Sequence, residues 1–170
     1  MSAQTTVKTT PVSFNDLTLD AILKGIKSQT RRIIKQEHFC GADLQPDALN
    51  SAGPEQTRHI SMMLANSPYG QVGDRLTCGE LTLEITKLHI QRVRDITARD
   101  AVREGLHTLP ASGRYCLMPG MQYFGEASHD AREVFSWLWD DIYGEGSWGS
   151  NPWVWAIEFK RLDGTQELKQ

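Results

Sequence analysis

The segment spanning residues 25–32 brings together side chains that could carry out nucleophilic chemistry. Its sequence is Gly-Ile-Lys-Ser-Gln-Thr-Arg-Arg, so Lys27 and Thr30 are three residues apart and Arg31 and Arg32 follow directly. A lysine close to other cations has a lowered pKa, because like charges disfavour the ammonium form. Such a lysine could act as a base and activate the Thr30 hydroxyl. The alternative is a solvated basic turn, because runs of charge usually lie on exposed faces.

A carboxylate and aromatic rings elsewhere in the chain could contribute to the same site. Glu80 is a candidate carboxylate between two predicted strands, although an exposed glutamate is the ordinary case. Tyr69 and Trp148 lie in predicted turns, where their rings could stack on a base. Trp153 and Trp155 alternate along a predicted strand, and we expect them to pack in the core.

Two predicted helices must position these groups. Apolar residues at helical spacing predict a helix over residues 19–26, with Thr18 as its N-cap. Thr97 starts a sequence that resembles a capping box, which predicts a short helix ending at Glu104 and Gly105. The ends of these helices would bring Lys27 and Glu104 from distant parts of the chain to one site.

Alternating apolar residues predict the strands. Period-two alternation marks strands over residues 75–78, 81–93 and 153–159, with a bulge or bend near residues 86–87 where the phase changes. Few strands surrounded by helices indicate an α+β fold, and we expect a small mixed β-barrel.

A second long helix and two long loops complete the predicted organisation. The helix starts near Asp130, stops at Gly144 and buries an apolar face that includes Ile142. Loops are expected over residues 36–68 and 106–128, the first with a short helix around residues 59–64.

Length and composition favour one globular domain. The 170 residues, 39% of them hydrophobic, can bury one ordinary core. We expect this domain over residues 12–165, after a disordered lead-in of residues 1–11 and before a tail of residues 166–170. Neither a membrane span nor a signal peptide is evident, which favours a cytoplasmic protein.

The cysteines and the charge pattern narrow the classes of partner. Three cysteines lie far apart, so we expect neither a disulfide framework, nor a metal site, nor a cofactor. The net charge of −3 argues against a broad DNA-binding surface. Residues 24–35 nevertheless hold five lysines and arginines and no acid, which leaves room for a small cationic site. Such a site suits one nucleoside or a short single strand of RNA or DNA.

Several motifs occur in the order found in the ASCH-domain family, which belongs to the PUA-like superfamily. They are Gly25-x-Lys27-x-x-Thr30-x-Arg32, Gly73-Asp74-x-Leu76, Asp95-Ile-Thr97 with Ala101-x-x-Glu104-Gly105, and Trp153-Val-Trp-Ala-Ile-Glu-Phe-Lys160. The chain resembles this family over roughly residues 17–32, 70–105 and 150–162. Its sequence over residues 68–76 and 146–155 is similar to that of uncharacterised ASCH-like proteins of tailed phages and prophages. The resemblance implies a small β-barrel that accepts a nucleobase or nucleoside.

One characterised branch that the chain resembles is a small amidohydrolase that removes the acetyl group of N4-acetylcytidine. The resemblance places its catalytic lysine and threonine at Lys27 and Thr30, and its catalytic glutamate at Glu104. It implies that Thr30 attacks the acyl carbon, Lys27 takes the proton and Glu104 orients Lys27 or assists the proton transfer. Arg31 or Arg32 would then stabilise the oxyanion or hold a phosphate.

Three functions therefore stay open at this point. The first is an amidohydrolase that acts on a modified nucleoside. The second is a binding module for RNA or modified nucleic acid, which would use the same residues without catalysis. The third is a phage accessory protein that binds a host protein through the two long loops.

Overall fold

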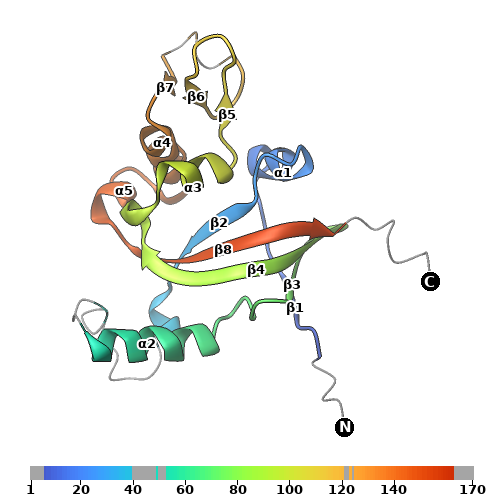
Figure 1. The fold of residues 1–170 in the computed structure, drawn as a ribbon, viewed down its shortest axis with the longest axis vertical. Coiled ribbons are helices and arrows are strands. Elements are labelled where there is room, and N and C mark those ends of the chain that lie inside the picture. Colours follow the sequence, from blue (N-terminus) through green and yellow to red (C-terminus); the bar gives the residue numbers. More distant parts are fainter. Residues whose placement is uncertain (1–5, 40–48, 50–52, 121–122, 124, 163–170) are drawn as a thin grey trace. The chain divides into compact units, whose positions relative to one another are not determined.

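An open five-stranded sheet runs through the part of the chain that the structure describes (Figure 1). A computed structural model describes residues 6–39, 49, 53–120, 123 and 125–162. The strand order in the sheet is β1-β3-β4-β8-β2. The bounds of these strands are β1 Thr9–Pro11, β2 Gln29–Ile33, β3 Arg75–Cys78, β4 Leu81–Arg92 and β8 Trp153–Leu162.

The chain divides into two compact units, and each is built from segments distant in sequence. Unit 1 comprises residues 1–13, 33–90 and 157–170, and unit 2 comprises residues 14–32 and 91–156. Strands β2, β4 and β8 each start in one unit and end in the other. The candidate residues Lys27, Thr30 and Glu104 all belong to unit 2.

Unit 1 holds β1, β3, most of β4 and helix α2, which spans Pro54–Ala65. Strands β3 and β4 pair antiparallel, and their inward residues Leu76, Leu83 and Ile85 are completely buried. The buried positions of β4 are odd-numbered up to Ile85 and then shift to Ile90, and the strand curves along its length (Figure 1). A 3-10 turn over Gln36–His38 also lies in this unit.

A tight turn before β3 depends on Asp74. Its carboxylate accepts hydrogen bonds from the backbone N–H groups of Lys8 at 2.8 Å and Gln71 at 2.7 Å. Both hydrogen bonds lower the pKa of the Asp74 carboxyl, and the bond from Gln71 has the larger effect. Gly70 in the same turn has φ +100°, and a Cβ there would lie 2.6 Å from Asp74 Oδ2. Only glycine fits this position without moving Asp74.

Unit 2 holds the helices and a small second sheet. Its strands follow the order β5-β6-β7 and pair antiparallel. Helix α4 lies against β6 and β7, and its buried residues include Val134, Phe135, Leu138 and Trp139. The remaining bounds are α1 Asp16–Leu23, 3-10 turn Val93–Asp95, α3 Ala98–Arg103, β5 His107–Thr108, β6 Tyr115–Cys116, β7 Ala127–Ser128, α4 Ala131–Tyr143 and α5 Ser147–Ser150.

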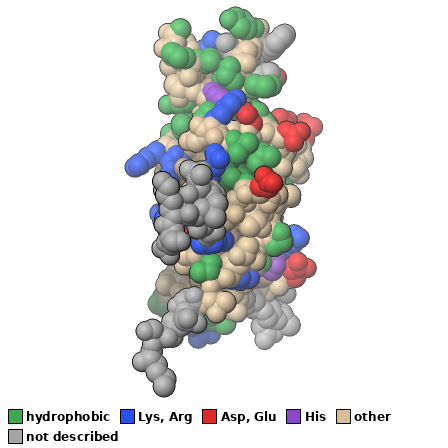
Figure 2. All heavy atoms as spheres, turned by 90° about the vertical axis from the view of Figure 1, so that its right-hand side faces the viewer, with side chains coloured by type: hydrophobic (Ala, Val, Ile, Leu, Met, Phe, Trp, Pro, Cys, Tyr) green, Lys and Arg blue, Asp and Glu red, His purple; other side chains and the backbone are tan. Residues whose placement is uncertain are grey.

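Hydrophobic side chains reach the surface at the end of unit 2 formed by the small sheet. Figure 2 shows several of them at the top of the face it presents. Met118 and Tyr123, both in the connection from β6 to β7, are exposed. Within the described residues, no helix has the length and apolar character needed to cross a membrane.

The α+β prediction is confirmed, with corrections in detail. The strand order is open, with β1 and β2 at its ends, so no closed barrel is detected in the described part of the chain. The prediction of disorder over residues 1–11 is wrong for Thr9–Pro11, whose backbone pairs in parallel with β3. Residues 106–128 are not loop throughout, because the strands β5, β6 and β7 lie there. Each has two residues, which is too short to show alternation in the sequence.

Helix boundaries also differ from the predictions. The N-cap of α1 is Asn15, not Thr18, because the Asn15 carboxamide accepts from the Thr18 backbone N–H at 2.8 Å. The short helix expected around residues 59–64 is part of the longer α2. Ile142 is exposed, since the buried face of α4 ends at Trp139. Residues 1–5, residues 40–48 of the first long loop and the tail of residues 166–170 lie outside the described residues.

Candidate functional site

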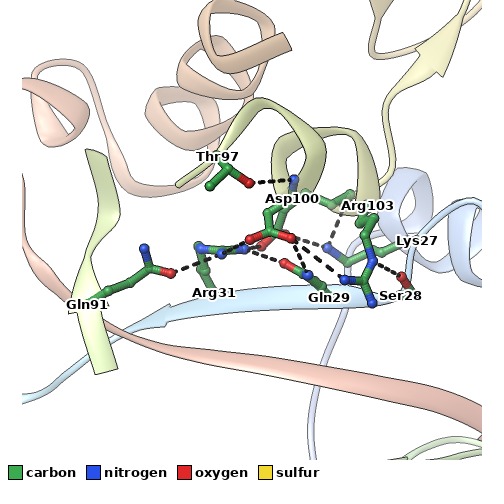
Figure 3. Close-up of polar contacts among 9 residues, drawn as sticks. Lys27, Ser28, Gln29, Arg31, Gln91, Thr97, Asp100 and Arg103 are labelled. Carbon is green, nitrogen blue, oxygen red and sulfur yellow. Dashed lines mark hydrogen bonds and ion pairs between the residues drawn. The ribbon is translucent and has the colours of Figure 1, made fainter. Parts of the chain in front are cut away.

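Two periodic patterns bring polar side chains of β2 and α3 together in unit 2. Successive strand residues point to opposite faces, so Gln29 and Arg31 share one face of β2. Residues four apart share a helix face, so Asp100 and Glu104 project from α3 and its C-cap on the same side. Figure 3 shows Gln29 and Arg31 pointing from β2 toward Asp100. Thr97 fixes the start of α3, because its Oγ1 accepts from the Asp100 backbone N–H at 3.1 Å.

The centre of this arrangement is a buried ion pair between Lys27 and Glu104. Lys27 Nζ donates to Glu104 Oε2 at 2.9 Å and to the Glu104 carbonyl oxygen at 3.0 Å. The two side chains are only 3% and 4% exposed. A charge buried to this degree must be paired and hydrogen-bonded to be tolerated, and each partner here satisfies the other.

Gly105 allows the segments that carry this pair to approach closely. Its φ is +116°, a conformation that disfavours any side chain. A Cβ at this position would lie 3.1 Å from Ala21 Cβ and 3.4 Å from Lys27 Cβ. The backbone of Lys27 is in turn anchored to α1, because its N–H donates to the Ala21 carbonyl at 3.0 Å.

Arg31 holds the second oxygen of the Glu104 carboxylate. Its Nη1 donates to Glu104 Oε1 at 2.7 Å and to Gln29 Oε1 at 2.9 Å. Its Nη2 donates to Gln91 Oε1 at 3.0 Å and lies 3.7 Å from Asp100 Oδ2. The side chain is completely buried, and its Nε has no acceptor among the described residues. Arg31 is therefore an internal cation, not one presented at the surface.

Asp100 provides the second negative charge of the cluster. Gln29 Nε2 donates to its Oδ1 at 2.8 Å, and Arg103 Nη1 lies 3.7 Å from the same oxygen (Figure 3). Burial by itself would raise the pKa of the Asp100 carboxyl. The hydrogen bond from Gln29 and the charge of Arg31 outweigh burial, so the pKa lies below its ordinary value of 3.8.

Burial lowers the pKa of the Lys27 amine below its ordinary value of 10.5. The Glu104 carboxylate opposes this shift, while the positive charges of Arg32 and Arg31 add to it. The sequence predicts a lowered pKa from neighbouring cations, whereas in the structure desolvation is the larger cause. The shift makes the neutral amine, which is the form that can accept a proton, easier to reach from the ammonium of the ion pair.

The structure brings together three of the residues singled out from the sequence, namely Lys27, Glu104 and Arg31. Thr30 is buried on β2, and strand alternation places it on the face opposite Arg31. Within the described residues, its hydroxyl has no hydrogen bond to Lys27 or Glu104. Arg32 is half-buried, and its guanidinium lies 5.1 Å above the Phe14 ring.

The other candidate residues are not part of this cluster. Tyr69 and Glu80 belong to unit 1, where Tyr69 follows α2 in a turn and Glu80 is exposed between β3 and β4. Trp148 lies on α5, not in a turn, and packs edge-on against Phe135 with ring centroids 5.9 Å apart. Binding of a base by these three residues stays a prediction.

Four members of the polar cluster escaped sequence analysis: Gln29, Gln91, Asp100 and Arg103. A signal for two of them exists, since Gln29 precedes Arg31 at strand spacing and Asp100 precedes Glu104 at helical spacing. These spacings indicate a site only when that face of β2 is known to pack against that face of α3 and its C-cap. In the described part of the chain, no group of three or more metal-ligating side chains occurs, and Cys78 and Cys116 are free thiols.

Comparison with known proteins gives one structural likeness. No family model matches the sequence, and no curated protein matches it. Among solved structures, the chain is similar to an ASCH domain from Lactobacillus crispatus JV V101, with a TM-score of 0.42 and 14% sequence identity. That likeness covers 91% of this chain and 79% of the other.

Proposed function

We propose that this protein hydrolyses an acyl group from a modified nucleoside such as N4-acetylcytidine, with Lys27 as the base. The observation that carries the proposal is the buried amine of Lys27, held 2.9 Å from Glu104, with its pKa lowered by burial. A general base needs a pKa near the working pH and a fixed position. Buried groups whose pKa is shifted by desolvation beside a charged partner concentrate at functional sites.

The proposed reaction uses Thr30 as the nucleophile. Lys27 Nζ accepts the hydroxyl proton while Thr30 Oγ1 bonds to the acyl carbon, and the resulting ammonium is stabilised by Glu104. The intermediate collapses by breaking the bond between the acyl carbon and the exocyclic nitrogen, which takes a proton from Lys27. Water then cleaves the threonine ester, and the products are the free nucleoside and the carboxylic acid.

Support for Thr30 is its place three residues after Lys27 in the sequence. No contact joins the Thr30 hydroxyl to Lys27, so a water molecule is the alternative nucleophile. The variant Thr30→Ala decides between the two. Loss of hydrolysis in Thr30→Ala, with partial recovery in Thr30→Ser, is the result expected for a covalent step. Unchanged hydrolysis in Thr30→Ala would transfer the nucleophilic role to a water molecule activated by Lys27.

The experiment incubates the purified protein with N4-acetylcytidine and a series of N4-acyl analogues, and measures cytidine release by chromatography. The variant Lys27→Arg is compared with Lys24→Arg, since Lys24 is exposed on the adjacent helix end and pairs with Asp20 at 2.6 Å. We expect kcat/KM to fall at least about 100-fold in Lys27→Arg, because general-base catalysis contributes about that factor or more. No cytidine release from any analogue, or equal rates in both variants, would refute the proposal.

A second candidate function is binding of a short single-stranded RNA without catalysis. The observation that favours it is that unit 2 exposes three arginines, Arg94, Arg99 and Arg132, and leaves a fourth, Arg32, half-buried. Each phosphate neutralised by such a cation adds to the salt dependence of binding. Substitution of Arg32 and Arg99 by glutamine should then weaken RNA binding and reduce its salt slope. Binding that does not change with salt would exclude this function.

A further inference from the structure

Asp100 joins the cluster through two bridges and does not contact Lys27 in any interaction that the structure shows. One bridge is Gln29, whose carboxamide donates to Asp100 at 2.8 Å and accepts from Arg31 at 2.9 Å. The other is Arg31 itself, which lies 3.7 Å from Asp100 and 2.7 Å from Glu104. The side chain of Asp100 thus reaches the ion pair of Lys27 by way of β2, whereas its backbone carbonyl accepts from the Glu104 N–H at 3.1 Å within the α3 end.

Two cations and two carboxylates alternate at the centre of this cluster, and Arg103 adds a partly exposed cation beside Asp100. Lys27 and Arg31 are its buried cations, and Glu104 and Asp100 are the carboxylates that face them. Glu104 gives one oxygen to each cation, so the position of its carboxylate depends on how strongly Arg31 attracts it. Arg31 places Nη1 toward Glu104 and Nη2 toward Asp100. The planar guanidinium keeps this two-sided geometry, whereas a lysine ammonium would not.

We propose that Asp100 is a positioning residue for the Lys27–Glu104 pair, acting through Gln29 and Arg31. Asp100 draws part of the Arg31 charge away from Glu104, which leaves Glu104 Oε2 to Lys27. This inference rests on the proposed function for its catalytic meaning, because only a reaction based on Lys27 would depend on that balance. Its physical content is a coupling between Asp100 and Lys27 that can be measured without a substrate.

The direction of the coupling follows from the charges that face Lys27. These are Glu104 from α3 and Arg31 and Arg32 from β2, while Asp20 and Lys24 of the α1 end pair with each other. Without the Asp100 charge, Arg31 has Glu104 as its remaining close counter-charge and attracts it more strongly. The Lys27 ammonium then has less compensation, so its pKa falls further.

The experiment titrates the Lys27 side chain by NMR in protein labelled with ¹⁵N and ¹³C lysine. The variant Asp100→Asn keeps the shape of the side chain and removes its charge. The matched control is Asp95→Asn, because Asp95 is exposed in the turn before α3. We expect Asp100→Asn to lower the Lys27 titration midpoint by about half a pH unit or more and Asp95→Asn to leave it unchanged. Equal midpoints in wild type and Asp100→Asn would overturn the proposal.

A second measurement uses the wild-type protein and stays informative if Asp100→Asn does not fold. The ¹⁵N resonance of the Lys27 ammonium is followed while the Asp100 carboxyl is titrated with acid. Coupling through Arg31 predicts that the Lys27 resonance moves with the midpoint of Asp100. A Lys27 resonance that stays constant through that midpoint contradicts the coupling.

These titrations separate the inference from the proposed function. A protein that hydrolyses no acyl nucleoside but shows the shifted Lys27 midpoint refutes the function and retains the coupling. A protein that hydrolyses N4-acetylcytidine with the same pH profile in wild type and Asp100→Asn retains the function and refutes the positioning role. A purely structural Asp100 would change the unfolding midpoint alone.

Discussion

At the scale of single residues, the cluster is defined by how Glu104 is shared. Each of its carboxylate oxygens is held by a different buried cation, Lys27 at 2.9 Å and Arg31 at 2.7 Å. Removal of one partner from a buried ion pair is costly because it leaves an uncompensated charge. Loss of Glu104 would leave Lys27 without a counter-charge and Arg31 with Asp100 alone, 3.7 Å away.

The variant Glu104→Gln should therefore destabilise the protein by about 3–5 kcal/mol. The matched control is Glu80→Gln, since Glu80 is exposed in the turn between β3 and β4. Urea denaturation followed by circular dichroism measures both free energies of unfolding, and Glu80→Gln should change it by less than about 0.5 kcal/mol. Similar free energies of unfolding for the two variants would contradict the buried ion pairs of Glu104.

Asp100 gives the stability of the protein a dependence on acid pH. Its carboxyl has a pKa below 3.8 in the folded state, so the folded protein binds this proton less readily than the unfolded chain does. The stabilisation is present above the ordinary pKa and is lost as the pH falls through the lowered one. Urea midpoints compared between about pH 5 and pH 3 should fall less steeply in Asp100→Asn than in wild type. An identical slope in both proteins would contradict the lowered pKa.

At the scale of elements, the cluster depends on close approach between α1 and Gly105, which follows the C-cap residue of α3. Gly105 combines φ +116° with a Cβ position 3.1 Å from Ala21. The α3 end is also tied to the segment before β2, because the Ser28 N–H donates to the Arg103 carbonyl at 2.9 Å. A side chain at Gly105 would push these segments apart and lengthen the Lys27–Glu104 contact.

The variant Gly105→Ala should cost about 1–3 kcal/mol beyond the backbone strain of its positive φ. Gly144→Ala is the control for strain alone, because Gly144 has φ +102° and nothing within 4 Å of its Cβ position. Thermal unfolding of both variants isolates the contribution of the close approach. If Gly144→Ala is destabilised as much as Gly105→Ala, crowding against Ala21 is not what this glycine relieves.

Several elements could be predicted from the sequence, and the reason is local. Thr97 caps α3 as expected, because its hydroxyl needs only the backbone N–H three residues later. The strand pair β3–β4 and the strand β8 follow from alternation within each segment. The same local argument failed for Thr18, since Asn15 three residues earlier is an equally good cap and the apolar spacing did not show where the first turn begins.

At the scale of the whole molecule, the sequence alone does not decide whether the charged segment of residues 24–35 is a solvated turn or a site. The structure divides it, because Lys24 and Lys35 are exposed whereas Lys27 and Arg31 are buried. Charge spacing could not show this division. It is decided by Asp100 and Glu104, which lie some seventy residues later and meet β2 only after folding.

This cluster also bears on how the basic segment contributes to the surface charge of a protein whose net charge is −3. Its two buried cations are matched by two carboxylates, so the basic segment adds little positive charge to the surface at that point. This arrangement suits recognition or chemistry on one neutral nucleoside better than attraction of a long polyanion. It is the whole-molecule reason for ranking hydrolysis of a modified nucleoside above general RNA binding.

The most direct test of the account is the pH dependence of cytidine release from N4-acetylcytidine. The account predicts that kcat/KM rises with pH to a plateau, with a midpoint below 10.5 that equals the titration midpoint of Lys27 in the same protein. It also predicts that this rise disappears in Lys27→Arg. Absence of hydrolysis at every pH, or a profile that Lys27→Arg leaves intact, would contradict the account.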